Sequence, residues 1–80
     1  MKNYDFPLIV FNPDILGGKP CIKGTRISVD IVLEWLATGA TISEICKTYS
    51  HITESGITQA LLFAAHRIKN ESFFEFKKSA

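Results

Sequence analysis

The sequence predicts a small α+β domain, mostly helical, in which a short β-hairpin precedes three helices. Residues 1–28 carry turn signals and short β-branched apolar runs, whereas after residue 28 the apolar spacing changes from two to three or four. With 80 residues, 46% of them hydrophobic and 21% charged, the composition is globular and allows one domain. We expect a leader over 1–28, a helical core over 29–70 and a tail over 71–80.

The leader is expected to form short strands separated by turns. The apolar, β-branched run at 8–11 ends at an Asn-Pro-Asp turn signal, and Gly-Gly-Lys-Pro at 17–20 is a second one. Residues 21–23 and 26–28 flank Gly24-Thr25, which is typical of a tight reversal. We therefore expect strands on both sides of that reversal.

The three helices are located by their capping residues. Ser28 is the expected N-cap of the first helix, which Gly39 ends. Thr41 and Glu44 form a capping box at the start of a short second helix, and Thr53 caps a longer third one. The core stripe of the third helix is expected to comprise Ile57, Ala60, Leu61, Ala64 and Ile68. A short capped helix, a turn and a longer helix form the helix-turn-helix outline of winged-helix or homeodomain-like domains.

The sequence offers little support for catalysis, a metal or a cofactor. Cys21 and Cys46 are far apart without a Cys-x-x-Cys spacing, and neither His51 nor His66 has a recognisable nucleophilic partner. We expect no enzyme, no metal and no cofactor. The longest apolar run, 61–65, is too short to span a membrane, and no secretory signal opens the chain, so we expect a cytoplasmic protein.

A basic segment early in the chain is the first candidate binding feature. Lys19, Lys23 and Arg26 lie within residues 15–29, which hold no acid, although the whole chain carries only +1. On or beside a hairpin, the three cations would lie against DNA phosphates, and a solvated loop is the equal alternative for both lysines. For Arg26 we favour a structural role, in which it holds the backbone or a carboxylate such as Asp14 or Asp30.

The start of the third helix is the second candidate DNA-binding feature. Ser55, Thr58 and Gln59 are expected to face away from the core stripe. Glutamine pairs with adenine, and serine or threonine reaches phosphate or base, although an ordinary polar face is the favoured alternative. Since one copy carries little charge, we expect DNA binding to require a dimer or a complex.

An apolar surplus suggests a partner-binding surface. Leu62 and Phe63 lie beside the stripe of the third helix, and Phe73, Phe74 and Phe76 cluster in the tail. A small core without disulfide spacing or metal gains stability from another chain. We therefore predict that these five residues contact a second subunit or another protein. The alternative is a tail that folds back onto its own core.

The glycine-rich basic stretch at 17–27, Gly-Gly-Lys-Pro-Cys-Ile-Lys-Gly-Thr-Arg-Ile, and the Leu-Ala-Thr-Gly-Ala-Thr at 36–41 are distinctive. They resemble the family called domain of unknown function 433, over about residues 9 to 68. The chain departs from that pattern at Ser50, where the family has proline, and at 54–56, where it has Pro-Glu-Asp. Gly56 is expected to weaken the first turn of the third helix by up to about 1 kcal/mol relative to alanine.

The resemblance implies a VapB-like antitoxin encoded beside a PIN-like toxin. We accordingly expect a homodimer that neutralises a PIN-like ribonuclease by direct contact and binds operator DNA to repress its own operon. The alternative is a homodimeric protein-interaction module with no nucleic-acid role. A gene for an acidic-site ribonuclease next to this one would distinguish the two.

Overall fold

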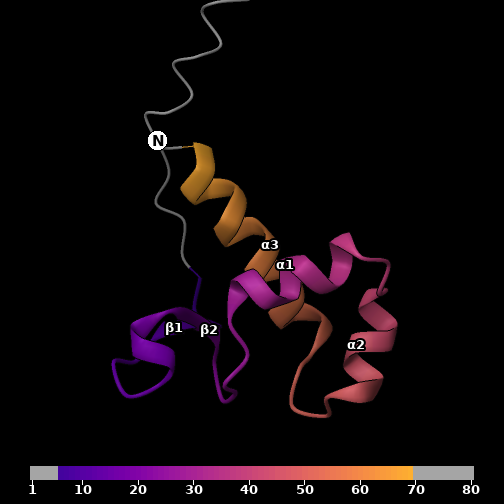
Figure 1. Ribbon diagram of the computed structural model, residues 1–80, viewed down its shortest axis with the longest axis horizontal. Helices are drawn as coiled ribbons and strands as arrows, with labels where there is room; N and C mark the ends of the chain where they lie inside the picture. Colours follow the sequence, from indigo (N-terminus) through magenta and orange to yellow (C-terminus); the bar gives the residue numbers. More distant parts are fainter. Residues whose placement is uncertain (1–5, 70–80) are drawn as a thin grey trace, which may run out of the picture.

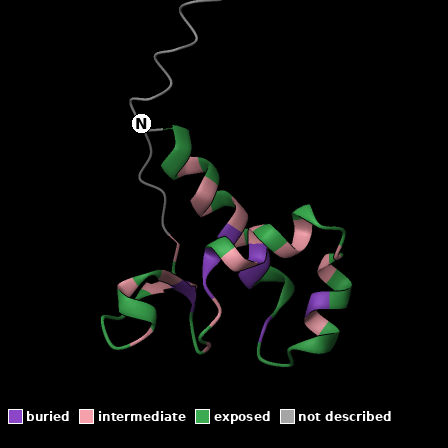
Figure 2. Cartoon of the chain, viewed as in Figure 1, coloured by how far each residue is buried: buried purple, intermediate pink, exposed green. Residues whose placement is uncertain are grey.

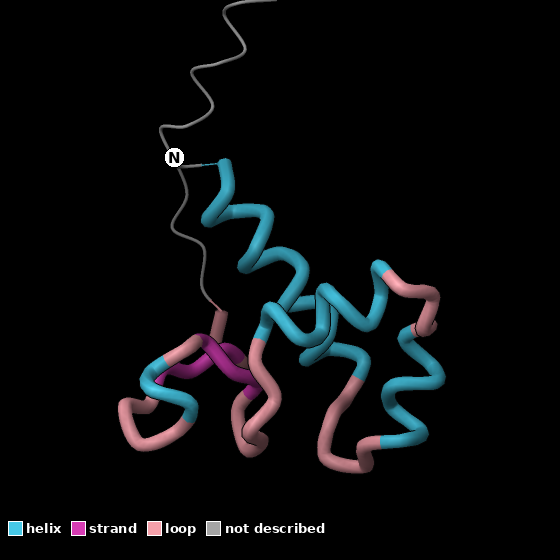
Figure 3. Tube along the Cα trace, in the orientation of Figure 1, coloured by secondary structure: helices cyan, strands magenta, loops and turns pink. Residues whose placement is uncertain are grey.

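A computed structural model of the protein describes residues 6–69. Within them an antiparallel two-stranded hairpin precedes three helices (Figures 1 and 3), which confirms the predicted mostly helical α+β class. The tail prediction for Phe73, Phe74 and Phe76 lies outside the described residues. The elements are β1 (Ile9–Phe11), the 3-10 turn η1 (Leu16–Gly18), β2 (Pro20–Ile22), α1 (Val29–Ala37), α2 (Ile42–Thr48) and α3 (Glu54–Lys69).

The hairpin differs in one respect from the prediction. The reversal at Gly24-Thr25 is present, and the Thr25 N–H donates to the Ile22 carbonyl at 3.0 Å. The strand expected at 26–28 is reduced to a single bridge between Cys21 and Ser28, because the Ile27 N–H donates to the Thr25 hydroxyl instead of a strand partner. The sheet therefore consists of β1 and β2, with Ile9 opposite Ile22, Val10 opposite Cys21 and Phe11 opposite Pro20.

The predicted caps of α1 and α2 are found in place. Gly39, with φ of 111°, follows α1 in the left-handed conformation that favours glycine. Thr41 and Glu44 complete the capping box, with donor–acceptor distances of 2.8 and 3.1 Å. Ser28 occupies the N-cap position of α1, but its hydroxyl donates to the Asp30 carboxylate rather than accepting from the helix backbone.

The start of α3 combines a cap with a close approach to the hairpin. The Thr53 hydroxyl accepts from the Gly56 N–H at 3.1 Å, as predicted. Gly56 is buried, and a Cβ added there would lie 3.2 Å from Cγ2 of the buried Ile22. The glycine therefore does more than weaken the first turn of α3, since it lets the helix lie directly against β2.

The core lies where α1, α3 and the hairpin meet (Figure 2), and α2 contributes Ile45 to it. The predicted stripe of α3 is correct over its first part, since Ile57 and Ala60 are fully buried. Its last member, Ile68, was predicted wrongly and is 47% exposed, because the end of α3 extends past the elements that cover its start (Figure 1). The buried hydrophobic cluster comprises Ile9, Ile22, Val29, Val32, Ile45, Ile52, Ile57 and Ala60.

Candidate functional site

Among the residues that the structure describes, the basic segment divides into one paired and two unpaired cations. Lys19 Nζ lies 3.3 Å from the Asp30 carboxylate, and both side chains are more than half exposed. Lys23 and Arg26 are exposed and make no side-chain hydrogen bond or ion pair with any residue in 6–69. The prediction that Arg26 holds a carboxylate is therefore wrong. Asp30 pairs with Lys19 instead, and Arg26 makes no ion pair with Asp14. Arg26 instead contributes its positive charge to the protein surface.

The carboxylate of Asp30 is held in its charged form. The hydrogen bond from the Ser28 hydroxyl lowers the pKa of Asp30 most, and Lys19 lowers it further. The Lys19–Asp30 pair itself contributes at most about 1 kcal/mol because water screens it. Lys19 is therefore partly neutralised, which leaves Lys23 and Arg26 as the free positive charges of this segment.

The start of α3 presents two of the three predicted polar residues to solvent. Ser55 and Thr58 are exposed. Gln59 is half-buried, and its Oε1 accepts from the Leu8 N–H at 2.9 Å, so the prediction that it faces outward is wrong. This bond fastens the leader to α3 across 51 positions of sequence, and no local pattern marks it. The exposed carboxylate of Glu54, beside Ser55, opposes the approach of phosphates.

Phe63, predicted to bind a partner, is half-buried against the leader. Its ring lies 5.6 Å from Phe6, edge to face, and 5.8 Å from Phe11. The Arg67 guanidinium lies 5.5 Å from the same ring. Phe63 therefore contributes mainly to folding, because two aromatic residues of the leader pack against it.

The second half of α3, residues 62–69, is the most exposed part of the helix. We call it the distal half of α3. It contains no buried residue, whereas Gly56, Ile57 and Ala60 are buried in the first half (Figure 2). Leu62 is 56% exposed and was correctly placed beside the core stripe. Its first four residues are apolar, and Arg67 and Lys69 flank the apolar Ile68 near its end.

A groove of about 370 Å³ runs beside the distal half of α3. Since apolar walls are combined with basic residues, the surface suits a partner that is both apolar and acidic. The groove is lined by the apolar residues Pro20, Val29, Leu33, Phe63, Ala64 and Ile68 and by the charged residues Lys19, Asp30 and Arg67.

The nucleophilic and metal-binding side chains are dispersed over the described part of the chain. Within 6–69 no three His, Cys, Asp or Glu residues gather as a metal-binding group would require. Burial raises the pKa of the Cys21 thiol, and the nearby Asp30 charge raises it further, so the reactive thiolate is disfavoured. None of the helices described here has the length and apolar character needed to cross a membrane.

Comparisons with known proteins identify a family. The family model described as "Protein of unknown function (DUF433)" matches residues 9–64. The crystal structure of a DUF433 member protein from Anabaena variabilis ATCC 29413 is similar, with a TM-score of 0.72 and 24% sequence identity. The match covers 78% of this chain but only 61% of that one, and at this identity it shows a shared fold alone. No curated protein matches the chain.

Proposed function

This chain belongs to the DUF433 family of proteins of unknown function, and from that premise we propose that it is an antitoxin that neutralises a PIN-like ribonuclease by direct binding. The observation that carries the proposal is the distal half of α3. There Leu62 and Ile68 are exposed beside Arg67 and Lys69, on a helix whose first half is firmly held in the core.

The chemistry of this surface supports such a partner. A ribonuclease whose catalytic site is built from carboxylates presents an acidic surface. Arg67 and Lys69 complement that charge, and Leu62 and Ile68 supply the apolar area that stabilises an interface when water is removed. While α3 occupies the acidic catalytic site of the ribonuclease, the RNA substrate would be excluded from that site.

The test is coexpression with the product of the neighbouring gene, which the proposal expects to be a PIN-like ribonuclease. The double variant Leu62→Ser/Ile68→Ser should lose copurification and the ability to stop cleavage of a labelled RNA. The matched control is Leu16→Ser, which removes an equally exposed leucine from η1, far along the chain from α3. It should retain both properties.

Two outcomes would contradict the proposal. The first is a wild-type protein that neither copurifies with the ribonuclease nor protects the RNA. The second is loss of both properties in the Leu16→Ser control as well. A protein that forms a homodimer through the same surface and ignores the ribonuclease would be an interaction module with no nucleic-acid role.

We further propose that two copies, alone or with the toxin, bind operator DNA. Ser55 and Thr58 are exposed hydroxyl residues at the start of α3, and Lys23 and Arg26 supply positive charge that is unpaired within residues 6–69. A single copy with net charge +1 makes few phosphate contacts, which is why the dimer is needed. Gln59 is not expected to contact DNA, because its amide oxygen accepts a hydrogen bond from the leader.

Gel retardation of the upstream promoter fragment at several salt concentrations tests this second step. Ser55→Ala/Thr58→Ala should weaken retardation, whereas Ser43→Ala, an exposed hydroxyl on α2, should not. Salt-insensitive binding by a monomer would contradict it, and so would equal losses in both variants.

A further inference from the structure

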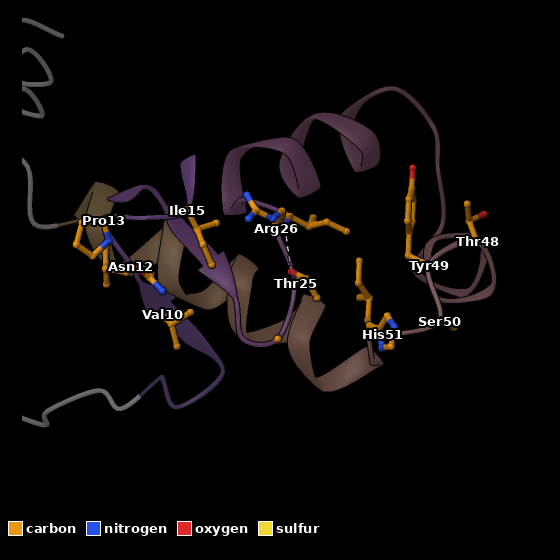
Figure 4. A pocket seen from close by; sticks show the side chains of 14 residues that line it. Val10, Asn12, Pro13, Ile15, Thr25, Arg26, Thr48, Tyr49, Ser50 and His51 are labelled. Atoms are coloured by element: carbon orange, nitrogen blue, oxygen red, sulfur yellow. Dashed lines mark hydrogen bonds between the residues drawn. The ribbon is translucent and has the colours of Figure 1, made fainter. Parts of the chain in front are cut away.

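A second groove, larger than the one beside α3, plays no part in the proposed antitoxin contact. It encloses about 960 Å³ between the turn that follows β1, the Gly24 turn and the turn from α2 to α3. In Figure 4 Asn12, Pro13 and Ile15 lie at one end and Thr48 and Tyr49 at the other. Because Arg26 and His51 both line it, we call it the Arg26–His51 groove.

The charge of this groove favours an anion. Arg26 is the one charged residue among its 14 lining residues, and none of those residues is an acid. Asp14 lies between Pro13 and Ile15 in the sequence but does not line the groove. Arg26 has no carboxylate partner within 6–69, so its charge is available to a ligand. The whole chain is nearly neutral, which makes this local absence of acids a distinguishing feature.

One end of the groove offers an aromatic ring that is already held in place. Trp35 stacks on Tyr49 with ring centres 4.9 Å apart and planes 8° from parallel. Tyr49 nevertheless keeps 40% of its surface exposed and lines the groove. A ring fixed from one side loses little conformational entropy when a planar ligand group packs against it.

We propose that the Arg26–His51 groove binds a segment of single-stranded nucleic acid, with a phosphate on Arg26 and a base on Tyr49. Proteins hold single strands by combining cations that contact the phosphates with aromatic side chains on which the bases stack, and the groove offers one of each in Arg26 and Tyr49. A base inside a duplex is already stacked on its neighbours, so the Tyr49 ring is suited to an unpaired base. The site does not depend on toxin binding, because it uses none of residues 62–69.

Fluorescence anisotropy of the full chain with a labelled oligouridylate of about twelve nucleotides tests the proposal. Arg26→Gln should lower the slope of log affinity against log salt by about 0.7, the value for one phosphate contact on a single strand. Tyr49→Leu should weaken binding at least about fivefold through lost stacking, and Tyr49→Phe should restore it. Lys47→Gln is the matched control, since it removes an exposed cation that does not line the groove.

Competition decides the source of the ligand. Displacement of the oligonucleotide by uridine monophosphate at equal nucleotide concentration would assign the site to free nucleotides, and no displacement would assign it to a strand. The proposal is overturned if the oligonucleotide does not bind at low salt, or if a duplex of unrelated sequence binds equally well. It is also overturned if polyglutamate displaces the oligonucleotide as effectively as unlabelled oligouridylate does, or if Lys47→Gln matches the loss in Arg26→Gln. Because Arg26 is exposed and has no ion-pair partner in the described part of the chain, Arg26→Gln should keep the fold and can test the proposal even if Tyr49→Leu is unstable.

Discussion

The two halves of α3 belong to one continuous helix but have opposite environments. In the first half Thr53 caps the backbone, and Gly56, Ile57 and Ala60 are buried against the hairpin and α1. In the distal half no residue is buried, and Leu62 and Ile68 are exposed (Figure 2). Since helix propagation is favourable once a first turn exists, the packed half supports the exposed one. Apart from Phe63, which packs against Phe6 and Phe11, the distal half is therefore free to be selected for binding rather than for folding.

The largest difference between the two halves should appear on truncation of an apolar side chain. Ile57→Ala leaves a cavity in the core and should lower the free energy of unfolding by about 2–5 kcal/mol. Leu62→Ala removes a mostly exposed side chain and should change it by less than about 0.5 kcal/mol. Urea denaturation followed by circular dichroism measures both. Similar losses in the two variants would mean that the halves do not differ in this way.

A smaller effect is expected where the first half meets β2. Alanine at position 56 would gain about 1 kcal/mol of helix propensity, but its Cβ would lie 3.2 Å from Ile22 Cγ2. Overpacking costs about 1–3 kcal/mol, so Gly56→Ala should lower stability by about 1 kcal/mol, seen as a lower urea midpoint.

A double-mutant cycle identifies the cause of that loss. Ile22→Leu removes the branch that carries Cγ2, and in this background Gly56→Ala should cost less or become stabilising. A stabilising effect of Gly56→Ala in the wild-type background would show that α3 does not need this close approach.

The smallest effect concerns Asp30, whose carboxylate lines the groove beside the distal half. Folding lowers the pKa of Asp30, so the ionised carboxylate stabilises the folded state. This stabilisation is present above the unfolded-state pKa of about 3.9 and is lost as the pH falls through the lower pKa of the folded state. Asp30→Asn should therefore flatten the loss of stability below about pH 4, by less than about 1 kcal/mol because the carboxylate is exposed. Urea midpoints measured between about pH 2 and pH 6 test this. An unchanged acid limb in the variant would contradict it.

The parts of the fold that were predictable are those with short-range signals. The capping box of Thr41 and Glu44, the cap at Thr53 and the glycine at position 39 each act within a few residues, and all are found. The loss of the strand expected at 26–28 could not be predicted in this way. The Ile27 N–H is bonded to Thr25 within the turn, so the strand pairing there is reduced to the bond from the Ile22 N–H to the Ile27 carbonyl and the bridge between Cys21 and Ser28.

The binding surfaces were less predictable than the fold. Leu62 was placed correctly, because its distance from the core stripe follows from helical periodicity. Phe63 and Gln59 are turned toward the leader by Phe6, Phe11 and Leu8, about fifty residues earlier, and no periodicity reports such contacts. Arg26 was expected to pair with a carboxylate, yet it lines a groove without acids.

The sequence by itself determined the order of elements, the caps and the buried stripe at the start of α3, because hydrogen bonding and periodicity within a helix are local. Only the tertiary structure decided which side chains remain available to a partner. The bond from the Leu8 N–H to Gln59 and the aromatic contacts around Phe63 join segments far apart in sequence. Exposure therefore depends on what packs over a residue, and the residue's own neighbours along the chain do not reveal it.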